Sequence, residues 1–223
     1  MAIVWPCPVP VEKYAADGRD VVVPRPLCPS CSMPMRFWSG YRRSVRVDGC
    51  WLLVWVRRAR CRGCRCSHGL IPSFLLRGRQ DPVSVIGESV AAVAGGVSIG
   101  ETARRVGVPF TTVRGWWRRF RVRASVWWSG FAALTVELGG QVPARWPPGP
   151  SAGAVAAIGW AHQAAVGRWP TLTPPVWGFV SVIVGGTLIG PANTTSPWRV
   201  FGNRRFMPPS PNPGRQGGHG HDE

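Results

Sequence analysis

Two cysteine pairs with the same internal spacing, Cys28-Pro-Ser-Cys31 and Cys61-Arg-Gly-Cys64, constrain the fold of this chain more than any other feature. A C-x2-C turn directs two thiolates toward one point, and two such turns complete a tetrahedron of sulfur ligands around zinc. Small or turn-forming residues inside each pair suit that tight backbone. The sequence therefore predicts a structural zinc ion bound by Cys28, Cys31, Cys61 and Cys64.

The segment between the pairs is typical of a β-hairpin. Residues 41–47 and 51–56 are strand-like, and Asp48-Gly49 between them is a two-residue turn signal. Pair, hairpin, pair is the layout of a zinc ribbon, which we expect over residues 28–80. The ribbon aromatics Trp38, Tyr41, Trp51 and Trp55 could stack on unpaired bases, but in so small a domain aromatics more often fill the core.

The remaining cysteines leave one alternative open. There are seven in all, and an odd number argues against a fully paired disulfide framework. Cys66 or His68, just after the second pair, could replace one of its ligands, although the four-cysteine set keeps the usual reach of each turn. We expect Cys66 to be a free thiol and His68 a hydrogen-bonded structural residue. A closed four-thiolate site stabilises a fold and does not catalyse.

Residues 81–123 have the pattern of three helices, which predicts a helix-turn-helix. Asp81-Pro82 is an expected helix start, and Gly95-Gly96 an expected stop. Ser98 and Glu101 fit a capping box at the start of a short second helix. Gly107 follows where the turn requires a positive φ, and Pro109 opens the third helix.

The third helix has an inner and an outer face. Val113, Trp116, Trp117 and Phe120 follow the helical period and predict the buried face, toward which Phe110 could also point. The opposite face suits a DNA major groove, and the expected base contacts are Thr111, Thr112, Arg114 and Arg118. Phosphate contacts are expected from seven further arginines: Arg42, Arg43, Arg104, Arg105, Arg119, Arg121 and Arg123.

These motifs carry a resemblance to known proteins. The run from Ile99 to Trp116 (IGETARRVGVPFTTVRGW) resembles the helix-turn-helix of resolvase-like and transposase-like proteins. With the ribbon, residues 28–123 resemble the N-terminal DNA-binding part of insertion-sequence transposases. They are similar above all to short bacterial zinc-ribbon/helix-turn-helix proteins of uncharacterised function, through CPSC, RRARCRGC, SHGLIPSF and TTVRGWWRRF.

Charge supports a polyanionic partner and excludes one class of enzyme. The net charge is +17, and the stretch from Arg36 to Arg123 holds 18 arginines against four acidic residues. Nucleic acid is therefore the first expected partner, and an anionic membrane surface the second. No Asp or Glu lies between Glu137 and Asp222, so a complete transposase or nuclease with a carboxylate triad is not expected.

The rest of the chain divides by composition. Residues 1–27 are Pro-rich and predicted to be irregular apart from 21–23, and no signal peptide is recognisable. Residues 124–190 form a hydrophobic accessory region, with a helix expected over 124–138, a Gly/Pro-rich linker at 139–150 and a helix-competent stretch at 152–166. Residues 176–189 are uncharged but shorter than a membrane span, so a buried strand or packed helix is expected. Residues 191–223 are predicted to be a disordered tail.

The fold class expected is therefore mainly α with a small β zinc ribbon, followed by a trihelical helix-turn-helix and a hydrophobic, helical C-terminal region. We expect a cytoplasmic, nucleoid-associated, non-enzymatic protein that binds double-stranded DNA by sequence. Its role would be transcription regulation or DNA recognition for a mobile element, with a homodimer or a recombinase or transposase as further partners. The alternatives are a non-specific nucleic-acid binder and a membrane-associated scaffold. Cys66 with His68 is the best enzymatic pair, and it lacks a third group to orient it.

Overall fold

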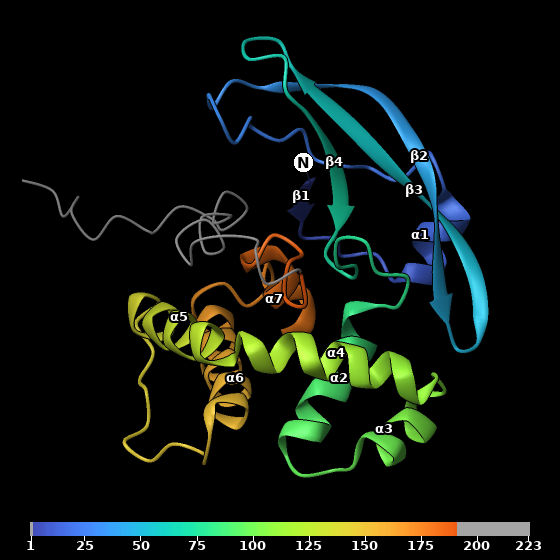
Figure 1. Ribbon diagram of the computed structural model, residues 1–223. Coiled ribbons are helices and arrows are strands. Elements are labelled where there is room, and N and C mark those ends of the chain that lie inside the picture. Colours follow the sequence, from blue (N-terminus) through green and yellow to red (C-terminus); the bar gives the residue numbers. More distant parts are fainter. Residues whose placement is uncertain (1, 191–223) are drawn as a thin grey trace, which may run out of the picture.

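The computed structural model describes residues 2–190, which form a four-stranded β-sheet and seven α-helices. The strand order is β1-β4-β3-β2, and most of the helices gather on one side of this sheet (Figure 1). The mixture of helices with a sheet agrees with the coarse expectation, but the sheet is larger than a small ribbon. The expected tail at 191–223 lies outside the described residues.

The central hairpin agrees with the prediction and is longer than expected. β2 (Met35–Val47) and β3 (Cys50–Cys61) pair in antiparallel register, with Val47 opposite Cys50 across the turn. Asp48 and Gly49 have φ values of 48° and 78°, and positive φ at both central residues is the requirement of a type I′ turn. The register shifts between Phe37 and Ser39, so Trp38 is an extra residue in the edge strand.

The N-terminal segment corrects one expectation, because it is not irregular. β1 (Ala2–Trp5) pairs in parallel with β4 (Ser67–Pro72), and α1 (Val11–Asp17) follows. Tyr14 of α1 is fully buried and donates a hydrogen bond of 2.9 Å to the carbonyl oxygen of Trp55. A four-residue apolar strand becomes recognisable only with its pairing partner, which here is more than 60 residues away.

Three helices follow the sheet: α2 (Val83–Ala94), α3 (Ile99–Val106) and α4 (Phe110–Val122), each packed against the other two. Local signals account for the start of α3 and its end. Ser98 accepts a hydrogen bond of 3.1 Å from the Glu101 amide, and Gly107 ends α3 with a left-handed φ of 65°. The other half of the capping box is different, since the Glu101 carboxylate pairs with Arg104 at 2.5 Å.

Asp81 does not cap α2 as the sequence suggested. Pro82 occupies the N-cap position without a side-chain hydrogen bond, and Asp81 is instead an ion-pair partner of Arg46 in β2. The Nε atom of Arg46 lies 2.8 Å from the Asp81 carboxylate, and the Arg46 amide also donates to the carbonyl of Gln80. Asp81 thus attaches the start of the helical region to the edge strand of the sheet.

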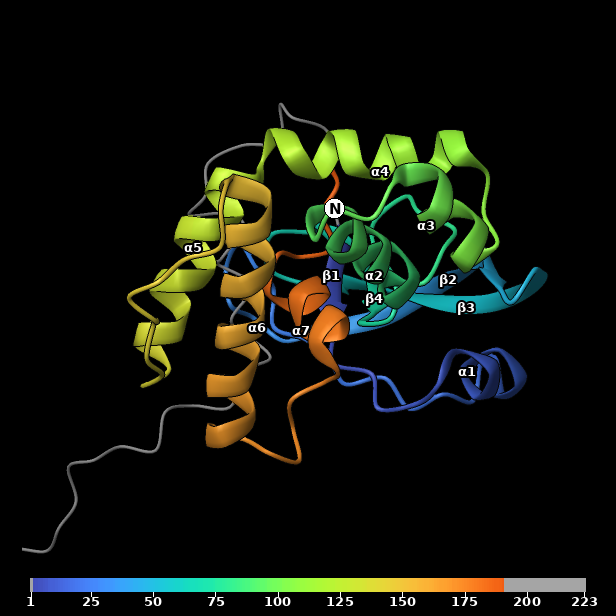
Figure 2. The same ribbon diagram turned by 90° about the horizontal axis from the view of Figure 1, so that it is seen from below.

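The accessory region is helical and packs on α2–α4. It comprises α5 (Ala124–Glu137), α6 (Pro150–Arg168) and α7 (Val176–Ile183), and residues 139–149 contain neither helix nor strand. Figure 2 shows α5 and α6 side by side at one end of α4. One hydrophobic core runs from α2 through α4 to Ile189, so the last third of the described chain is continuous with the helices before it.

α7 connects this helical core with a second core around the sheet. Val180 and Ile183 belong to the helical core, and Val182 belongs to the sheet core. Ser181 between them donates a hydrogen bond of 2.6 Å to the carbonyl of Leu75. The segment 176–189 is thus a packed helix followed by turns, and no helix among residues 2–190 is long and apolar enough to cross a membrane.

Candidate metal centre and nucleic-acid interface

Four cysteine sulfurs converge at the end of the hairpin away from its turn. The Sγ atoms of Cys28, Cys31, Cys61 and Cys64 all lie within 4.8 Å of one another. Cys28 is 3.4 Å from Cys64, and Cys31 is 3.3 Å from Cys61, so each short contact joins the two pairs. Sulfurs bound 2.3 Å from a zinc ion at tetrahedral corners would be about 3.8 Å apart. The four cysteines are positioned to bind a metal ion, as the spacing predicted.

The backbone around each pair explains this convergence. In the first pair, the Cys28 amide donates a hydrogen bond to the carbonyl of Met33, and the Ser32 amide donates one to the carbonyl of Cys28. Ser32 has a positive φ of 60°. In the second pair, β3 ends at Cys61, whose amide donates to Cys66, and Arg65 has a φ of 60°. Both turns fold the chain back within six residues, and β3 delivers the second turn beside the first.

The thiols of the cluster do not ionise equally. Burial disfavours the Cys28 thiolate, but the amides of Ser30 and Cys31 and the thiol of Cys64 stabilise it, so the pKa of Cys28 falls to about 6. The amide of Met33 likewise lowers the pKa of Cys31. The amide of Cys66 favours the thiolate of Cys64. The hydrogen bond between the Cys64 and Cys28 side chains and the desolvation of Cys64 outweigh this effect and raise the pKa of Cys64 to about 12. Metal binding requires the thiolate, which this site favours at two of its members.

The other cysteines stand outside this cluster. Cys7 is buried, and burial raises its pKa to about 11, which makes it an unreactive thiol. Cys50 lies at the hairpin turn, at the other end of β3 from Cys61. Cys66 is partly exposed and is not among the four converging residues.

His68 differs from its expected role. Its side chain is only 2 % exposed, and within residues 2–190 neither ring nitrogen has a hydrogen-bond partner. Burial lowers its pKa, so the ring is held neutral in the sheet core. We therefore describe His68 as a buried histidine without the hydrogen bond that we expected.

The outer face of α4 presents one stripe of polar and basic side chains. Val113, Trp116 and Phe120 are buried as predicted, whereas four residues on the opposite side are exposed: Thr111, Arg114, Arg118 and Arg121. In the described part of the chain the side chains of these three arginines make no hydrogen bond or ion pair, although the Arg114 guanidinium lies 5.9 Å from the centre of the Phe110 ring. Phe110 is itself half-exposed and not turned inward.

Two of the expected phosphate contacts are structural instead. Arg123 is 7 % exposed and donates a hydrogen bond of 3.0 Å to the carbonyl of Thr187. Arg43 is partly buried and donates to the carbonyls of Leu76 and Arg79. Burial lowers the pKa of both guanidinium groups. With their donors committed to carbonyls, neither is presented for phosphate binding.

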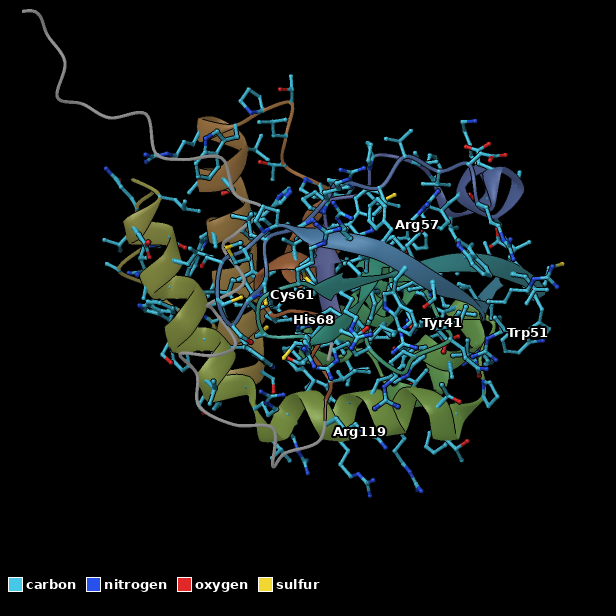
Figure 3. The ribbon with its side chains drawn as sticks, turned by 90° about the horizontal axis from the view of Figure 1, so that it is seen from above. Tyr41, Trp51, Arg57, Cys61, His68 and Arg119 are labelled. Carbon is cyan, nitrogen blue, oxygen red and sulfur yellow. The ribbon has the colours of Figure 1, made fainter. Side chains whose placement is uncertain are left out.

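The remaining expected contacts are accessible to different degrees. Arg42 and Arg121 are exposed, and Thr112 is half-buried. Arg104 and Arg105 are exposed but share the Glu101 carboxylate, at 2.5 and 3.9 Å. Arg119, labelled on α4 in Figure 3, is half-buried and donates to the Gly115 carbonyl at 3.1 Å.

The sequence reasoning misjudged the ribbon aromatics. Trp38, Tyr41 and Trp51 are 52 %, 41 % and 56 % exposed, so they do not fill the sheet core as aromatics more often do. The same alternation that puts Val54 and Val56 inside puts Trp51 and Leu53 outside. That alternation was available in the sequence, but it does not reveal which face is buried.

Comparison with known proteins adds one similarity. The model of a family described as a domain of unknown function (DUF6431) matches residues 28–106. The matched segment contains all four clustered cysteines, the hairpin and the helices α2 and α3. No curated protein and no solved structure matches the chain.

Proposed function

We propose that this protein binds double-stranded DNA in a sequence-specific manner through α4, with α3 and α4 acting as a helix-turn-helix. The observation that carries the proposal is the outer stripe of α4. It combines a hydroxyl side chain with three arginines whose guanidinium groups make no hydrogen bond or ion pair in the described chain, Arg114 lying over the ring of Phe110. Arginine bridges guanine N7 and O6 in the major groove, and threonine can meet a base edge or a thymine methyl.

The geometry of the neighbouring helices supports this use of α4. Gly107, with its left-handed φ, joins α3 to the turn before α4. Val108 in that turn and Val113 in the first turn of α4 are both buried in the helical core. The inner face of α4 packs into the helical core through Trp116 and Phe120, which are almost fully buried. A helix held on its inner face and free on its outer face can enter a groove without refolding.

The contacts divide into two roles in this proposal. Thr111, Thr112 and Arg114, at the N-terminal end of α4, would read bases, and Arg118 would extend the reading. Arg121 and the exposed Arg42 would contact phosphates. Arg104 and Arg105 would do so after exchanging their ion pairs with the Glu101 carboxylate for ion pairs with phosphate. Arg119 would need to leave its contact with Gly115. Arg43 and Arg123 have no role in binding.

Zinc is the metal that best suits the cluster. Four thiolates in a tetrahedral arrangement are typical ligands of structural zinc. The four cysteines would fill all four coordination positions of the ion and leave none open for a substrate. When bound, the ion would hold the two cysteine turns together and so fix the end of the hairpin. The protein is then a non-enzymatic DNA binder. Its role would be transcription regulation or DNA recognition for a mobile element, and the resemblance of its motifs to transposase DNA-binding parts favours the second.

Selection from random duplex DNA at about 150 mM salt tests the proposal, since salt suppresses purely electrostatic binding. We expect a defined motif to be recovered with the wild-type chain. Arg114→Ala should then relax one position of that motif, at a cost of about 1–3 kcal/mol for the preferred base. Arg145→Ala, which removes an exposed arginine between α5 and α6, is the matched charge control and should keep the motif.

Two outcomes would contradict the proposal. Binding without any recovered motif would mean a non-specific nucleic-acid binder. Equal loss of affinity for Arg114→Ala and Arg145→Ala on every duplex would mean that α4 contributes charge and not base recognition. A motif with two-fold symmetry would in addition indicate that the protein binds as a homodimer.

A further inference from the structure

One face of the β2–β3 hairpin carries arginine and apolar side chains, of which Arg42, Trp51 and Leu53 are exposed to solvent and Arg46 is ion-paired with Asp81. Residues opposite each other in an antiparallel pair lie on the same face, and every second pair shares that face. Four such pairs follow in order: Gly40 with Arg57, Arg42 with Trp55, Ser44 with Leu53, and Arg46 with Trp51. We call these eight residues the hairpin face.

The hairpin face is open, whereas the opposite face is packed. Trp51 and Leu53 are 56 % and 54 % exposed, and Arg42 is exposed beside them. On the other face Val45, Val54 and Val56 are fully buried in the sheet core. By register, Arg57 and Tyr41 lie on opposite faces of the hairpin. Figure 3 shows Trp51 near the hairpin turn.

Arginine guanidinium groups accompany the rings of this surface. Arg46 lies 5.9 Å from the centre of the Trp51 ring, and Arg19, from the loop after α1, lies 4.3 Å from that of Trp55. Trp55 also lies across Gly40, where an added Cβ would come within 2.5 Å of its ring. An open pocket of about 470 Å³ adjoins Trp55, Arg19 and Arg57.

The charge of this hairpin indicates what could cover it. Residues 35–61 contain seven arginines and one acidic residue, Asp48, at the turn. Flat rings interleaved with cations are what proteins use to bind unpaired nucleotides, because every base can stack and every phosphate carries a negative charge.

We propose that the hairpin face binds single-stranded nucleic acid, with Trp51 as an open stacking platform and Arg42 as a phosphate contact. Trp55, beside Arg57, would contact the end of the nucleic-acid strand that is farther from Trp51. From Arg57 to Trp51 the strand β3 rises by about 20 Å, which corresponds to at most about six nucleotides at 3.4 Å each. This goes beyond duplex binding by α4: it shares Arg42 with the proposed duplex contacts and uses none of the α4 stripe.

The hairpin face also reaches α4. Trp51 and Arg46 line a pocket of about 530 Å³ together with Thr112 and Trp116 of α4. An unpaired strand on the hairpin face would therefore leave the protein close to the N-terminal half of α4. A duplex with an adjoining single-stranded segment could contact both surfaces at once.

Fluorescence anisotropy of the full-length protein with labelled oligothymidylate and oligouridylate of four to twelve nucleotides tests this proposal. Wild-type affinity should rise with length and level off near six nucleotides, and the tighter of the two oligomers identifies DNA or RNA as the source of the strand. Trp51→Ala should weaken binding by about fivefold to about 150-fold, the loss expected for one stacked base, and Trp51→Phe should restore most of it. Tyr41→Ala, an exposed ring on the other face, is the matched control and should bind like the wild type.

A photo-cross-link supplies the direct readout. Oligonucleotides carrying 5-bromouracil should cross-link to the peptide that contains residues 51–57. The proposal is overturned if wild-type protein binds neither oligomer, if Trp51→Ala and Tyr41→Ala lose affinity equally, or if the cross-link maps to α4. Each variant is also titrated with duplex DNA. If the wild-type protein binds the single strands but no duplex, the role of α4 is refuted and the hairpin face stands. Equal loss on duplex and single strand in Trp51→Ala would overturn the separate site.

Discussion

Arg118 and Arg123 are five residues apart at the end of α4, and their guanidinium groups lie in different environments. Arg118 projects from the exposed stripe, whereas Arg123 stacks over the ring of Trp127 at 4.5 Å and donates to the carbonyl of Thr187. A hydrogen bond from a charged, buried group contributes about 1.5–3 kcal/mol to stability. An exposed arginine without a partner contributes to stability hardly at all.

Alanine substitution should therefore separate binding from stability at these two positions. Arg123→Ala should lower the free energy of unfolding by about 1.5–3 kcal/mol in urea denaturation. Arg118→Ala should change it by less than about 0.5 kcal/mol but should reduce duplex affinity and the steepness of its salt dependence. If Arg118→Ala destabilises the protein as much as Arg123→Ala does, the outer stripe of α4 is not free in solution.

His68 provides a pH-dependent term at the same scale. Its pKa in the folded protein is below its ordinary value of about 6.5 because burial disfavours the charged ring. The neutral ring thus contributes stability above pH 6.5 that is lost as the pH falls through the lowered pKa, at a slope of at most about 1.4 kcal/mol per pH unit.

The melting temperature measured from pH 7.5 to 5.5 in excess zinc should therefore fall more for the wild type than for His68→Phe, which cannot be protonated. The two profiles should converge above pH 7. Parallel profiles over the whole range would show that His68 is accessible to water and titrates alike in the folded and unfolded chains.

At the scale of elements, glycines in α2 and α6 show where helices touch. A Cβ added at Gly87 of α2 would lie 1.9 Å from the ring of Trp177 in α7, so the two elements approach closely only because this position has no side chain. Gly159 in α6 has no atom within 4 Å of such a Cβ. The first glycine is required by packing, and the second carries only the entropic cost of glycine in a helix.

Substitution of the two glycines by alanine should have opposite effects. Gly87→Ala should destabilise the protein by about 1–3 kcal/mol, because Trp177 must move away from α2. Gly159→Ala should stabilise it by about 0.5–1 kcal/mol. Urea denaturation followed by circular dichroism measures both, and a neutral Gly87→Ala would mean that α7 does not pack against α2 as described.

At the scale of the whole molecule, two hydrophobic cores are connected by α7, and the cysteine cluster belongs to only one of them. Cys28 and Cys61 are members of the sheet core, whereas α2 to α6 fill the helical core. Residues 76–81 connect the two units along the chain, where Arg43 and Arg46 of β2 hold them by hydrogen bonds. Removal of the metal should therefore affect the two cores unequally.

Elemental analysis should find one zinc ion per wild-type chain. Cys64→Ser should lose it, whereas Cys66→Ser, which leaves all four converging sulfurs in place, should retain it. A chelator should make peptide bonds of the sheet region protease-sensitive before those of α2–α6. Zinc loss from Cys66→Ser with retention in Cys64→Ser would show that Cys66 and not Cys64 is the ligand.

Features that depend on a few neighbouring residues were predictable from the sequence. The cysteine cluster follows from two turns of fixed reach and the hairpin from Asp48-Gly49. The inner face of α4 follows from the helical period of Val113, Trp116 and Phe120. In each case the physical cause acts within one turn or one hairpin. The positions of these signals along the chain therefore suffice to recognise them.

Features that depend on distant partners were decided only by the tertiary structure. β1 forms because β4 lies beside it and pairs with it. Asp81 forms an ion pair with Arg46 and does not cap α2. Arg43 is partly buried, Arg123 is buried, and both donate hydrogen bonds to loop carbonyls. The exposure of Trp51 likewise depends on which face of the hairpin the core covers. Residue types and spacing determined which groups could bind a metal or an anion, and packing between remote segments decided which of them are available to do so.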